Sequence, residues 1–230
     1  MKNIISLIFA CLILTNLSYS QSGKHGLKVV SGKEILNEYT DLTVDASSGD
    51  VTISVTNSNL NSNGRFAQGL EKGDLLMLIQ IQGASLKGLS QTDSAWGEIT
   101  SYNNAGNSEY IEVASIPNGT SIALTCALVN DYTASGKVMV VRVPRYSSLT
   151  LSSGDTISGD PWDGSIGGVV AIEVDGNASI DGVVEMNGKG FRGTTSTTGQ
   201  GSKPGARNEF ASSQPNAAGV KGEGIAVYQL

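Results

Sequence analysis

The stretch VDGNASIDGVVEMNGKGF (Val174–Phe191) divides into three successive groups of six residues. Each group begins with an apolar residue, followed by Asp or Asn and then by Gly. A period of six with an aliphatic first position matches the length of one face of a β-solenoid. In that fold each short strand points an aliphatic residue inward, the Gly-containing pair turns the corner, and stacked coils bury an apolar column. The alternative is a meander of hairpins joined by Asp-Gly turns.

The residues on either side fit coils but leave the direction of winding open. The preceding run VVAIEV (Val169–Val174) fits a right-handed parallel β-helix, whereas the period of six fits a left-handed hexapeptide helix. Residues 194–223 are rich in Gly, Ser, Thr, Ala and Asn and cannot bury a core of their own. The sequence GIAVYQL (Gly224–Leu230) then indicates the start of a further strand.

Upstream of the coils the pattern indicates antiparallel strands. Apolar residues alternate with polar ones or form short unbroken runs, and loops of Asn, Ser, Gly and Asp separate them. We predict strands at residues 50–57, 73–83, 109–116, 121–129 and 136–143, and one short helix within residues 32–39. In the second strand, Ile79 and Ile81 should face inward, and Gln80 and Gln82 outward. The sequence PNGT (Pro117–Thr120) predicts a hairpin, because Asn-Gly is a strong hairpin signal.

These patterns predict an all-β fold, in which an antiparallel β-sandwich or barrel precedes the start of a parallel β-helix (β-solenoid). Residues 1–20 have the features of a secretory signal peptide, because Lys2 precedes an apolar run, Ile4–Leu14, that is too short to span a bilayer. We expect cleavage before Gln21; lipidation of Cys11 is the alternative. The expected boundaries are the signal peptide at 1–20, the antiparallel β domain at 21–146, β-solenoid coils at 147–193, a low-complexity excursion at 194–223 and a further strand at 224–230.

Composition excludes several classes of partner and catalyst. Removal of Lys2 with the signal peptide would leave 14 basic and 21 acidic residues, a net charge of about −7 that repels nucleic acid. We expect no nucleic-acid partner and no membrane-spanning segment in the mature chain. The single histidine, His25, belongs to the expected flexible start of that chain, which excludes Ser-His-Asp and Cys-His catalysis and the usual zinc sites. Cys126 should be a small buried core residue.

Paired carboxylates remain as the catalytic arrangement that the composition permits, since glycosidases need two Asp or Glu residues. The candidates lie in the expected coils and are Asp155, Asp160, Asp163, Glu173, Asp175, Asp181 and Glu185. All seven should occupy turns or outward-facing strand positions, where a solvated carboxylate is ordinary. We therefore predict that the chain is not an enzyme, with a polysaccharide-degrading β-helix module as the alternative.

Two groups of residues are candidates for binding. Asp155, Asp160 and Asp163 lie within GDTISGDPWDG, and oxygen ligands on such a loop suit calcium. The alternative is that each Asp forms a turn with its own backbone. No other cofactor is expected. Trp96 and Trp162 lie in polar loops flanked by glycine, where a ring can stack on a sugar or cover the end of a barrel or solenoid.

Four stretches resemble the amino-terminal region of large secreted surface adhesins and gliding-motility proteins of Bacteroidetes, which the type IX system exports. They are residues 73–84 (GDLLMLIQIQGA), 96–113 (WGEITSYNNAGNSEYIEV), 132–151 (YTASGKVMVVRVPRYSSLTL) and 162–193, which ends in GKGFRG. The resemblance implies a β-helical fold at GKGFRG and an extracellular adhesive or structural role, with no catalytic residues to carry over. The family's long downstream repeats and carboxy-terminal sorting domain are not in this sequence, so we expect the 230 residues to be the amino-terminal part of a longer chain.

The same resemblance suggests modification sites and a location. Ser94 in DSA and Thr156 in DTI match the O-glycosylation acceptor of exported proteins in that phylum. We expect a secreted, cell-surface protein with an adhesive or structural role, part of a filamentous gliding-motility-type adhesin. Its polar loops would bind surface polysaccharide or other cell-surface components through many weak contacts. A carbohydrate-binding module is the alternative function, and a structural cap that starts solenoid folding is a third.

Overall fold

The computed structural model describes residues 21–87, 98–193, 209–210, 219–220 and 223–226. The regular structure of these residues is strand, apart from one 3-10 turn at Ala134–Gly136, so the predicted all-β class is confirmed. The helix predicted within residues 32–39 is wrong, because this segment contains β2 (Lys33–Ile35) and the start of β3 (Glu38–Asp41). The expected signal peptide and most of residues 194–230 lie outside the described residues. In the described part of the chain, no helix has the length and apolar character needed to cross a membrane.

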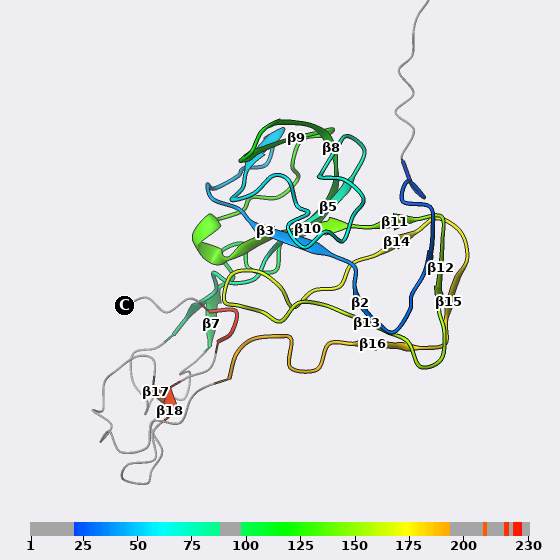
Figure 1. Ribbon diagram of the computed structural model, residues 1–230. Helices are drawn as coiled ribbons and strands as arrows, with labels where there is room; N and C mark the ends of the chain where they lie inside the picture. The colour runs from blue at the N-terminus through cyan, green and yellow to red at the C-terminus, as the bar shows by residue number, and fades with distance from the viewer. Residues whose placement is uncertain (1–20, 88–97, 194–208, 211–218, 221–222, 227–230) are drawn as a thin grey trace, which may run out of the picture.

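A six-stranded antiparallel sheet curls into what we call the half-barrel (Figure 1). Its strand order is β3, β10 (Val138–Val143), β5 (Leu75–Gln80), β8 (Ser108–Asn118), β9 (Ser121–Leu124) and β4 (Thr52–Ser54). The two outermost strands approach each other, because Leu42 beyond β3 pairs with Val55 beyond β4. The PNGT hairpin is confirmed, since Asn118 pairs with Ser121 at the turn between β8 and β9.

The half-barrel encloses an apolar core to which every one of its strands but β3 contributes. Its buried members include Ile53, Leu76, Leu78, Ile111, Ile122, Leu128 and Val140. In β5 the side chains of Leu76, Leu78 and Gln80 face inward. The prediction that Ile79 faces inward and Gln80 outward is therefore wrong. Cys126 is exposed, contrary to prediction, because β9 ends at Leu124 and the alternation stops there.

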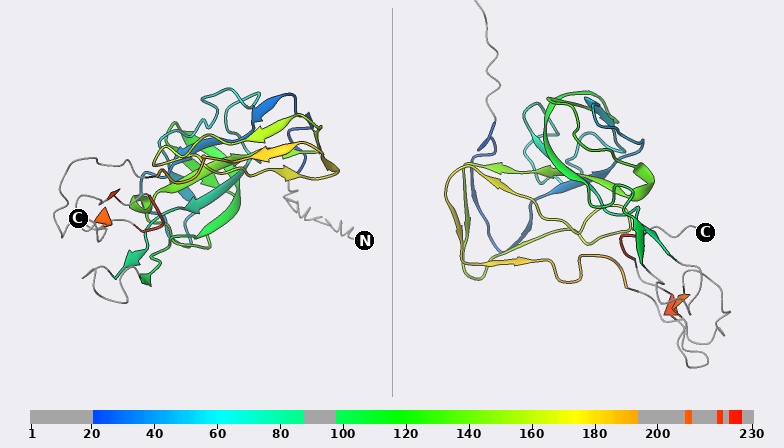
Figure 2. Two further views of the ribbon diagram at one scale, coloured as in Figure 1. Left: turned by 90° about the horizontal axis from the view of Figure 1, so that it is seen from below. Right: turned by 180° about the vertical axis from the view of Figure 1, so that it is seen from behind.

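Three small parallel sheets lie beside the half-barrel and form the sides of a triangle in Figure 1. One contains β1 (Leu27–Val29), β12 (Ser148–Leu151) and β15 (Ala178–Ile180), and the second contains β2, β13 (Thr156–Ser158) and β16 (Val183–Glu185). The third pairs β11 (Arg145–Tyr146) with β14 (Glu173–Val174). Residues 27–35, 145–158 and 173–185 therefore follow three stacked layers, which we call the first, second and third coils. Figure 2 (left) shows these layers from the side.

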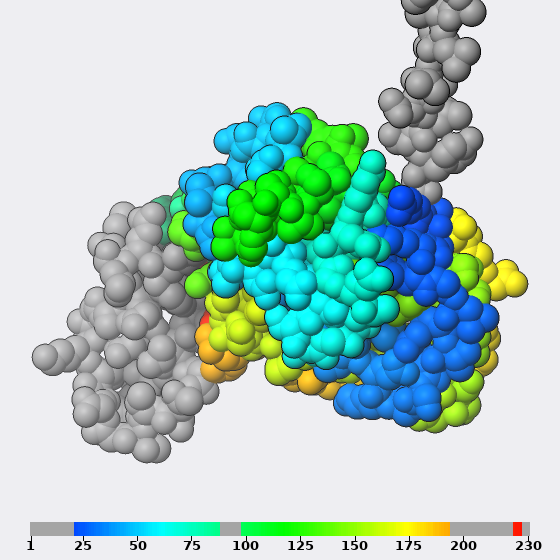
Figure 3. All heavy atoms as spheres, turned by 45° about the horizontal axis from the view of Figure 1, so that its top comes forward, coloured from blue at the N-terminus to red at the C-terminus, as the bar shows by residue number. Residues whose placement is uncertain are grey.

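The amino-terminal strands belong to the coils rather than to the antiparallel region to which residues 21–146 were assigned. Leu27 pairs with Ser148 and Glu34 with Ile157, across more than a hundred residues of sequence. The half-barrel is thus inserted between the first and second coils. In Figure 3 the blue amino-terminal residues and the cyan segment that leads to β5 lie against each other.

The first two groups of six residues supply most of the third coil, from Val174 at the end of β14 through β15 to β16, whereas the third group, residues 186–191, contains no strand. β14, β15 and β16 each pair in parallel with a strand of the second coil, whereas a hairpin meander would pair them antiparallel with one another. Gly176 and Gly182 turn the corners where the third coil approaches the second most closely. A Cβ atom on Gly176 would lie 2.6 Å from the Ser147 carbonyl oxygen, and one on Gly182 would lie 2.5 Å from that of Asp155. The repeated glycine therefore permits close stacking of coils.

The coils enclose a second, smaller core of Val30, Leu36, Tyr146, Leu149, Leu151 and Ile157. β10 contributes Val138 and Val140 to the core of the half-barrel and is buried along its whole length. The shorter strands β6 (Ser85–Leu86) and β7 (Ile99–Ser101) form a separate pair, as do β17 (Glu209–Phe210) and β18 (Gly219–Val220).

Candidate functional site

A buried carboxylate, Asp74, attaches the half-barrel to the amino-terminal segment. Its side chain is fully buried, and Oδ1 accepts a hydrogen bond from Lys24 Nζ at 2.8 Å. Oδ2 accepts one from Arg142 Nη2 at 2.7 Å, and His25 Nε2 lies 3.5 Å from Oδ1. Burial by itself raises the pKa of Asp74, but hydrogen bonds from His25 and Lys24 outweigh it and lower the pKa to about 2. The carboxylate is thus ionised and holds three basic side chains together.

Arg142, at the end of β10, lies inside the end of the half-barrel. Its side chain is 2% exposed and donates hydrogen bonds to the carbonyl oxygens of Gln68 (2.9 Å) and Gly69 (3.2 Å). The guanidinium carbon lies 3.8 Å from the centroid of the Phe66 ring. Burial lowers the pKa of Arg142, while Asp74 opposes that shift. The loop before β5 is thereby fixed across the end of the half-barrel.

Arg145, three residues further on, joins the half-barrel to the third coil. Its guanidinium pairs with Glu112 of β8 at 2.6 Å and with Glu173 of β14. His25, predicted to lie in a flexible segment, packs against this strand: its Nδ1 accepts a hydrogen bond from the Arg145 amide at 2.8 Å. Its ring meets Phe66 edge-on at a centroid distance of 5.2 Å. The only histidine therefore has a structural position at the junction.

At one end of the stacked coils, two charged side chains occupy the inward positions. Lys28 and Glu34 pair in register with Leu149 and Ile157, which are buried, so both charged side chains take the inward positions of the first coil. They form an ion pair with each other, and Glu34 also accepts a hydrogen bond from the Ser31 amide at 2.8 Å. Burial and the nearby Glu34 carboxylate raise the pKa of Tyr146 to about 12. This end, the closed end, thus covers the apolar column with a polar pair.

The other end of the coils carries apolar side chains at the same inward positions. In the third coil, Ile180 pairs with Leu151 and Val184 pairs with Ile157. Leu151 and Ile157 are fully buried, whereas Ile180 is 57% exposed and Val184 is 49% exposed. Because the inward column continues but is uncovered here, we call this side the open end. Its strands β15 and β16 are the outermost members of their sheets in the described residues.

The three aspartates proposed as calcium ligands do not converge. Asp155 accepts a hydrogen bond from the Gly32 amide at 2.7 Å, and Asp163 accepts two from the amides that follow it. Asp160 pairs with both terminal nitrogens of Arg65, at 2.7 and 2.9 Å. Within the described residues no group of three acidic, His or Cys side chains is placed to hold a metal ion. The turn-forming alternative therefore describes Asp163 alone: Asp155 binds the backbone of the first coil at Gly32, and Asp160 holds Arg65 from the half-barrel loop.

The remaining carboxylates considered for catalysis are Glu173, Asp175, Asp181 and Glu185 of the third coil. Glu173 faces Arg145, and Glu185 accepts a hydrogen bond from Lys33 Nζ at 2.7 Å. Asp181 accepts one from the Ser179 hydroxyl at 3.2 Å, while Asp175 is exposed at the corner after β14. Glu173 thus shares the Arg145 guanidinium with Glu112, an ion-paired arrangement that the sequence did not predict.

Trp162, proposed as a sugar-stacking ring, is 5% exposed. Its indole meets Phe191 edge-on at 6.0 Å, and Nε1 donates a hydrogen bond to Glu223 at 3.0 Å. The ring is therefore buried against Phe191 and Glu223 and is not displayed for stacking on a sugar. Trp96 and the glycosylation candidate Ser94 lie outside the described residues. Thr156 lies in β13, where strands on both sides pair with it.

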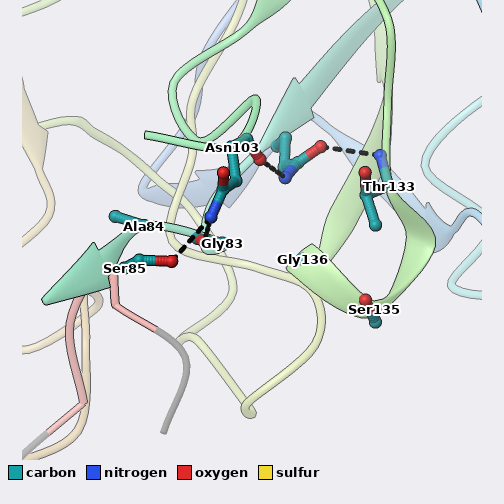
Figure 4. Close-up of a pocket in the computed structure, with 8 residues that line it drawn as sticks. Gly83, Ala84, Ser85, Asn103, Thr133, Ser135 and Gly136 are labelled. Carbon is teal, nitrogen blue, oxygen red and sulfur yellow. Dashed lines mark hydrogen bonds between the residues drawn. The ribbon is translucent and has the colours of Figure 1, made fainter. Parts of the chain in front are cut away.

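A polar hollow of about 230 Å³ lies where β5 ends, beside the 3-10 turn (Figure 4). Its lining consists of Gln80, Gly83, Ala84, Ser85, Asn103, Thr133, Ser135 and Gly136. The Gln80 amide forms its base and is held by three contacts: Nε2 donates to the carbonyl oxygens of Gln82 (2.8 Å) and Asn103 (3.0 Å), and Oε1 accepts from the Thr133 amide (2.8 Å). These backbone partners explain why a glutamine takes an inward position of β5.

Two glycines allow the backbone to close around Gln80. A Cβ atom on Gly136 would lie 2.3 Å from Gln80 Nε2, and Gly83 has a φ of +138°. Asn103, also in a left-handed conformation, donates from Nδ2 to the Gly83 carbonyl (3.1 Å) and to the Ser85 hydroxyl (2.7 Å). The hollow therefore has a rim fixed by hydrogen bonds, which sequence reasoning did not predict.

Comparison with known proteins gives no family for this chain. No protein-family model and no curated protein matches it. Among solved structures it is similar to tailspike gp61 of Pseudomonas phage phi297 (TM-score 0.30), tailspike gp49 of Pseudomonas phage LKA1 (0.29) and the Gp54 tailspike of Acinetobacter baumannii bacteriophage AP22, solved with capsular saccharide (0.32). Sequence identity is 13% in each case, over 68%, 57% and 69% of this chain. The chain spans only 23%, 22% and 27% of those proteins, and TM-scores of this size do not establish a shared fold.

Proposed function

We propose that this chain is an exported cell-surface protein with an adhesive or structural role, and that its coils are the first turns of a longer β-solenoid. The observation that supports this proposal is the difference between the two ends of the coils. A solenoid needs a polar cap at its terminus and an apolar column wherever another coil follows. The closed end has the Lys28–Glu34 pair, whereas the open end presents Ile180 and Val184.

The inserted half-barrel fits the same role. It is attached to the amino-terminal segment by the ion pair between Lys24 and the buried Asp74, and to the third coil by Arg145, which pairs with Glu112 and Glu173. We propose that it is the distal part of a filamentous protein of the gliding-motility adhesin type, with further coils leading back toward the cell. The function then depends on the length and stiffness of the stacked coils rather than on catalysis.

We expect the mature chain, residues 21–230, to self-associate through the open end when no further coil covers it. Strand edges with exposed apolar side chains are sites of such pairing. Replacing Val184 by Lys should weaken this association by at least about tenfold, because it puts a charge on the inward column. Sedimentation velocity over a range of protein concentrations measures the effect.

Val183→Lys is the matched control. Val183 precedes Val184 in β16 and is 56% exposed, but its register partner Thr156 faces outward, so the substitution should leave association unchanged. A chain that stays monomeric at all concentrations, or an equal effect of both substitutions, would contradict the open-end assignment.

The location is tested by immunogold labelling of intact cells that produce the protein, with an antibody against the half-barrel and a protease-shaving control. We expect gold particles on filaments away from the outer membrane, lost after shaving. Labelling confined to the periplasm would exclude the cell-surface role.

A further inference from the structure

We infer that the hollow at the end of β5 binds one ring of a neutral saccharide, a site that is separate from the open end and independent of the solenoid proposal. The inference rests on the chemistry of the lining. None of the eight residues around the hollow in the described chain is charged, and five of them carry an amide or hydroxyl side chain. Without a basic group the hollow does not suit phosphate, and without a carboxylate it does not suit calcium.

Three hydroxyl groups in the hollow can each donate a hydrogen bond to a ligand. The Ser85 and Thr133 hydroxyls accept hydrogen bonds from Asn103 Nδ2 (2.7 Å) and Asn104 Nδ2 (3.3 Å), so the proton of each hydroxyl stays available. Ser135 is exposed and its hydroxyl makes no hydrogen bond within the described residues. Figure 4 shows Ser85 on one side of the hollow and Thr133 and Ser135 on the other. A sugar ring, which has both donors and acceptors on its hydroxyls, complements such a set.

The hollow is also rigid before any ligand binds. The Gln80 amide is held in place by its three contacts, which use both N–H donors, and Gly83 and Gly136 are packed too closely to admit a side chain. A prearranged polar surface loses less conformational entropy when a ligand binds. Its volume of about 230 Å³ is below the range of about 300–1,000 Å³ typical of sites for drug-sized ligands, which fits a single ring of a longer chain.

An exposed aromatic residue directly precedes the rim. Tyr102 is 61% exposed and adjoins Asn103, whose carbonyl and side chain form part of the hollow. Aromatic side chains beside a polar site give apolar area against the C–H face of a sugar while the polar groups orient it. We assign Tyr102 as the ring that contacts the neighbouring sugar unit.

The matched control is Tyr110, which lies in β8 and is 59% exposed, away from the residues of the hollow. We expect the mature chain to bind at least one neutral hexasaccharide from a panel of maltohexaose, cellohexaose, laminarihexaose and mannohexaose with a millimolar Kd. Tyr102→Ala should weaken this binding by about tenfold, and Tyr110→Ala should leave it unchanged. Titration followed by NMR chemical shifts measures each Kd.

A second variant, Ser135→Trp, fills the hollow from an exposed position and should abolish binding without affecting stability. Ser153→Trp, at an exposed turn between β12 and β13, is its control. The inference is overturned if no neutral hexasaccharide binds, if only a heparin hexasaccharide binds, or if Tyr102→Ala and Ser135→Trp bind as the unaltered chain does. Val184→Lys should not change saccharide binding, so the experiments test the saccharide site and the open-end proposal independently.

Discussion

Replacing Asp74 by Ala is expected to lower the free energy of unfolding by about 3–5 kcal/mol, the range found when one partner of a buried ion pair is removed. The substitution leaves the guanidinium of Arg142 buried with only neutral partners, and its Nε already lacks a hydrogen-bond partner. Lys24 and His25 would lose their shared acceptor as well. Equilibrium unfolding in urea, followed by tryptophan fluorescence, measures the change.

Asp50→Ala is the matched control for this prediction. Asp50 and Asp74 each accept a hydrogen bond from the amide three residues earlier, at 2.8 and 3.0 Å. Asp50 is exposed and has no ion pair within the described residues, so its replacement should cost about 1 kcal/mol or less. Equal losses in the two variants would show that Asp74 acts only as a turn residue.

The contribution of Asp74 should also depend on pH. Its pKa is lowered from 3.8 to about 2 in the folded protein, so the carboxylate stabilises the fold fully above about pH 4. That stabilisation should be lost as the pH falls from about 4 to 2, which corresponds to about 2 kcal/mol. The difference in stability between the unaltered chain and Asp74→Ala should therefore shrink over this pH range. A constant difference would contradict the lowered pKa.

Gly182→Ala is expected to lower the free energy of unfolding by about 2–3 kcal/mol, because the coils must move apart to admit the methyl group. The added Cβ would lie 2.5 Å from the carbonyl oxygens of Ser152 and Asp155 and 2.8 Å from Leu151 Cγ. The two oxygens belong to the backbone of the second coil and cannot rotate away. The same urea unfolding measurement gives the value.

Gly190→Ala is the control for the coil contact. Gly190 belongs to the third group of six, but a Cβ there would meet open space, and its φ is not positive. Its replacement should change stability by no more than about 0.5 kcal/mol. If both glycine variants behaved alike, the glycines would serve only as flexible turn residues and not as contact points between coils.

The sequence predicted strands and turns best where the residues that specify them lie close together in the chain. Alternating and unbroken apolar runs predicted β4, β5, β8, β9 and β10, and Asn-Gly predicted the turn of the β8–β9 hairpin. The first two groups of six predicted the short strands β15 and β16 with their glycine corners, whereas the third group, residues 186–191, forms no strand. These features depend on neighbours within about ten residues, which a single sequence displays.

The errors concern residues whose partners are distant in sequence. β1 and β2 pair with strands more than a hundred residues away, so the apolar pattern near them did not mark the first coil. Gln80 faces inward because Asn103 and Thr133 supply backbone partners, and Asp160 holds Arg65 rather than a metal ion. The cap formed by Lys28 and Glu34 did have a signal, namely two opposite charges six residues apart in an otherwise strand-like segment.

The central claim is that the third coil stacks in parallel on the second. Paired positions in that arrangement are Thr150 and Ser179, which both face outward. We therefore propose a variant with cysteine at these two positions, in which Cys126 is replaced by Ser so that no other thiol of the mature chain interferes. Neighbouring residues of paired strands have the Cα separation that a disulfide requires.

Mild oxidation of this variant, followed by digestion and mass spectrometry, is the most direct test. The account predicts an intramolecular disulfide between positions 150 and 179, and no disulfide in a control with cysteines at positions 148 and 179, which are two residues out of register. Absence of the first disulfide, or equal yields in both variants, would contradict the stacked coils.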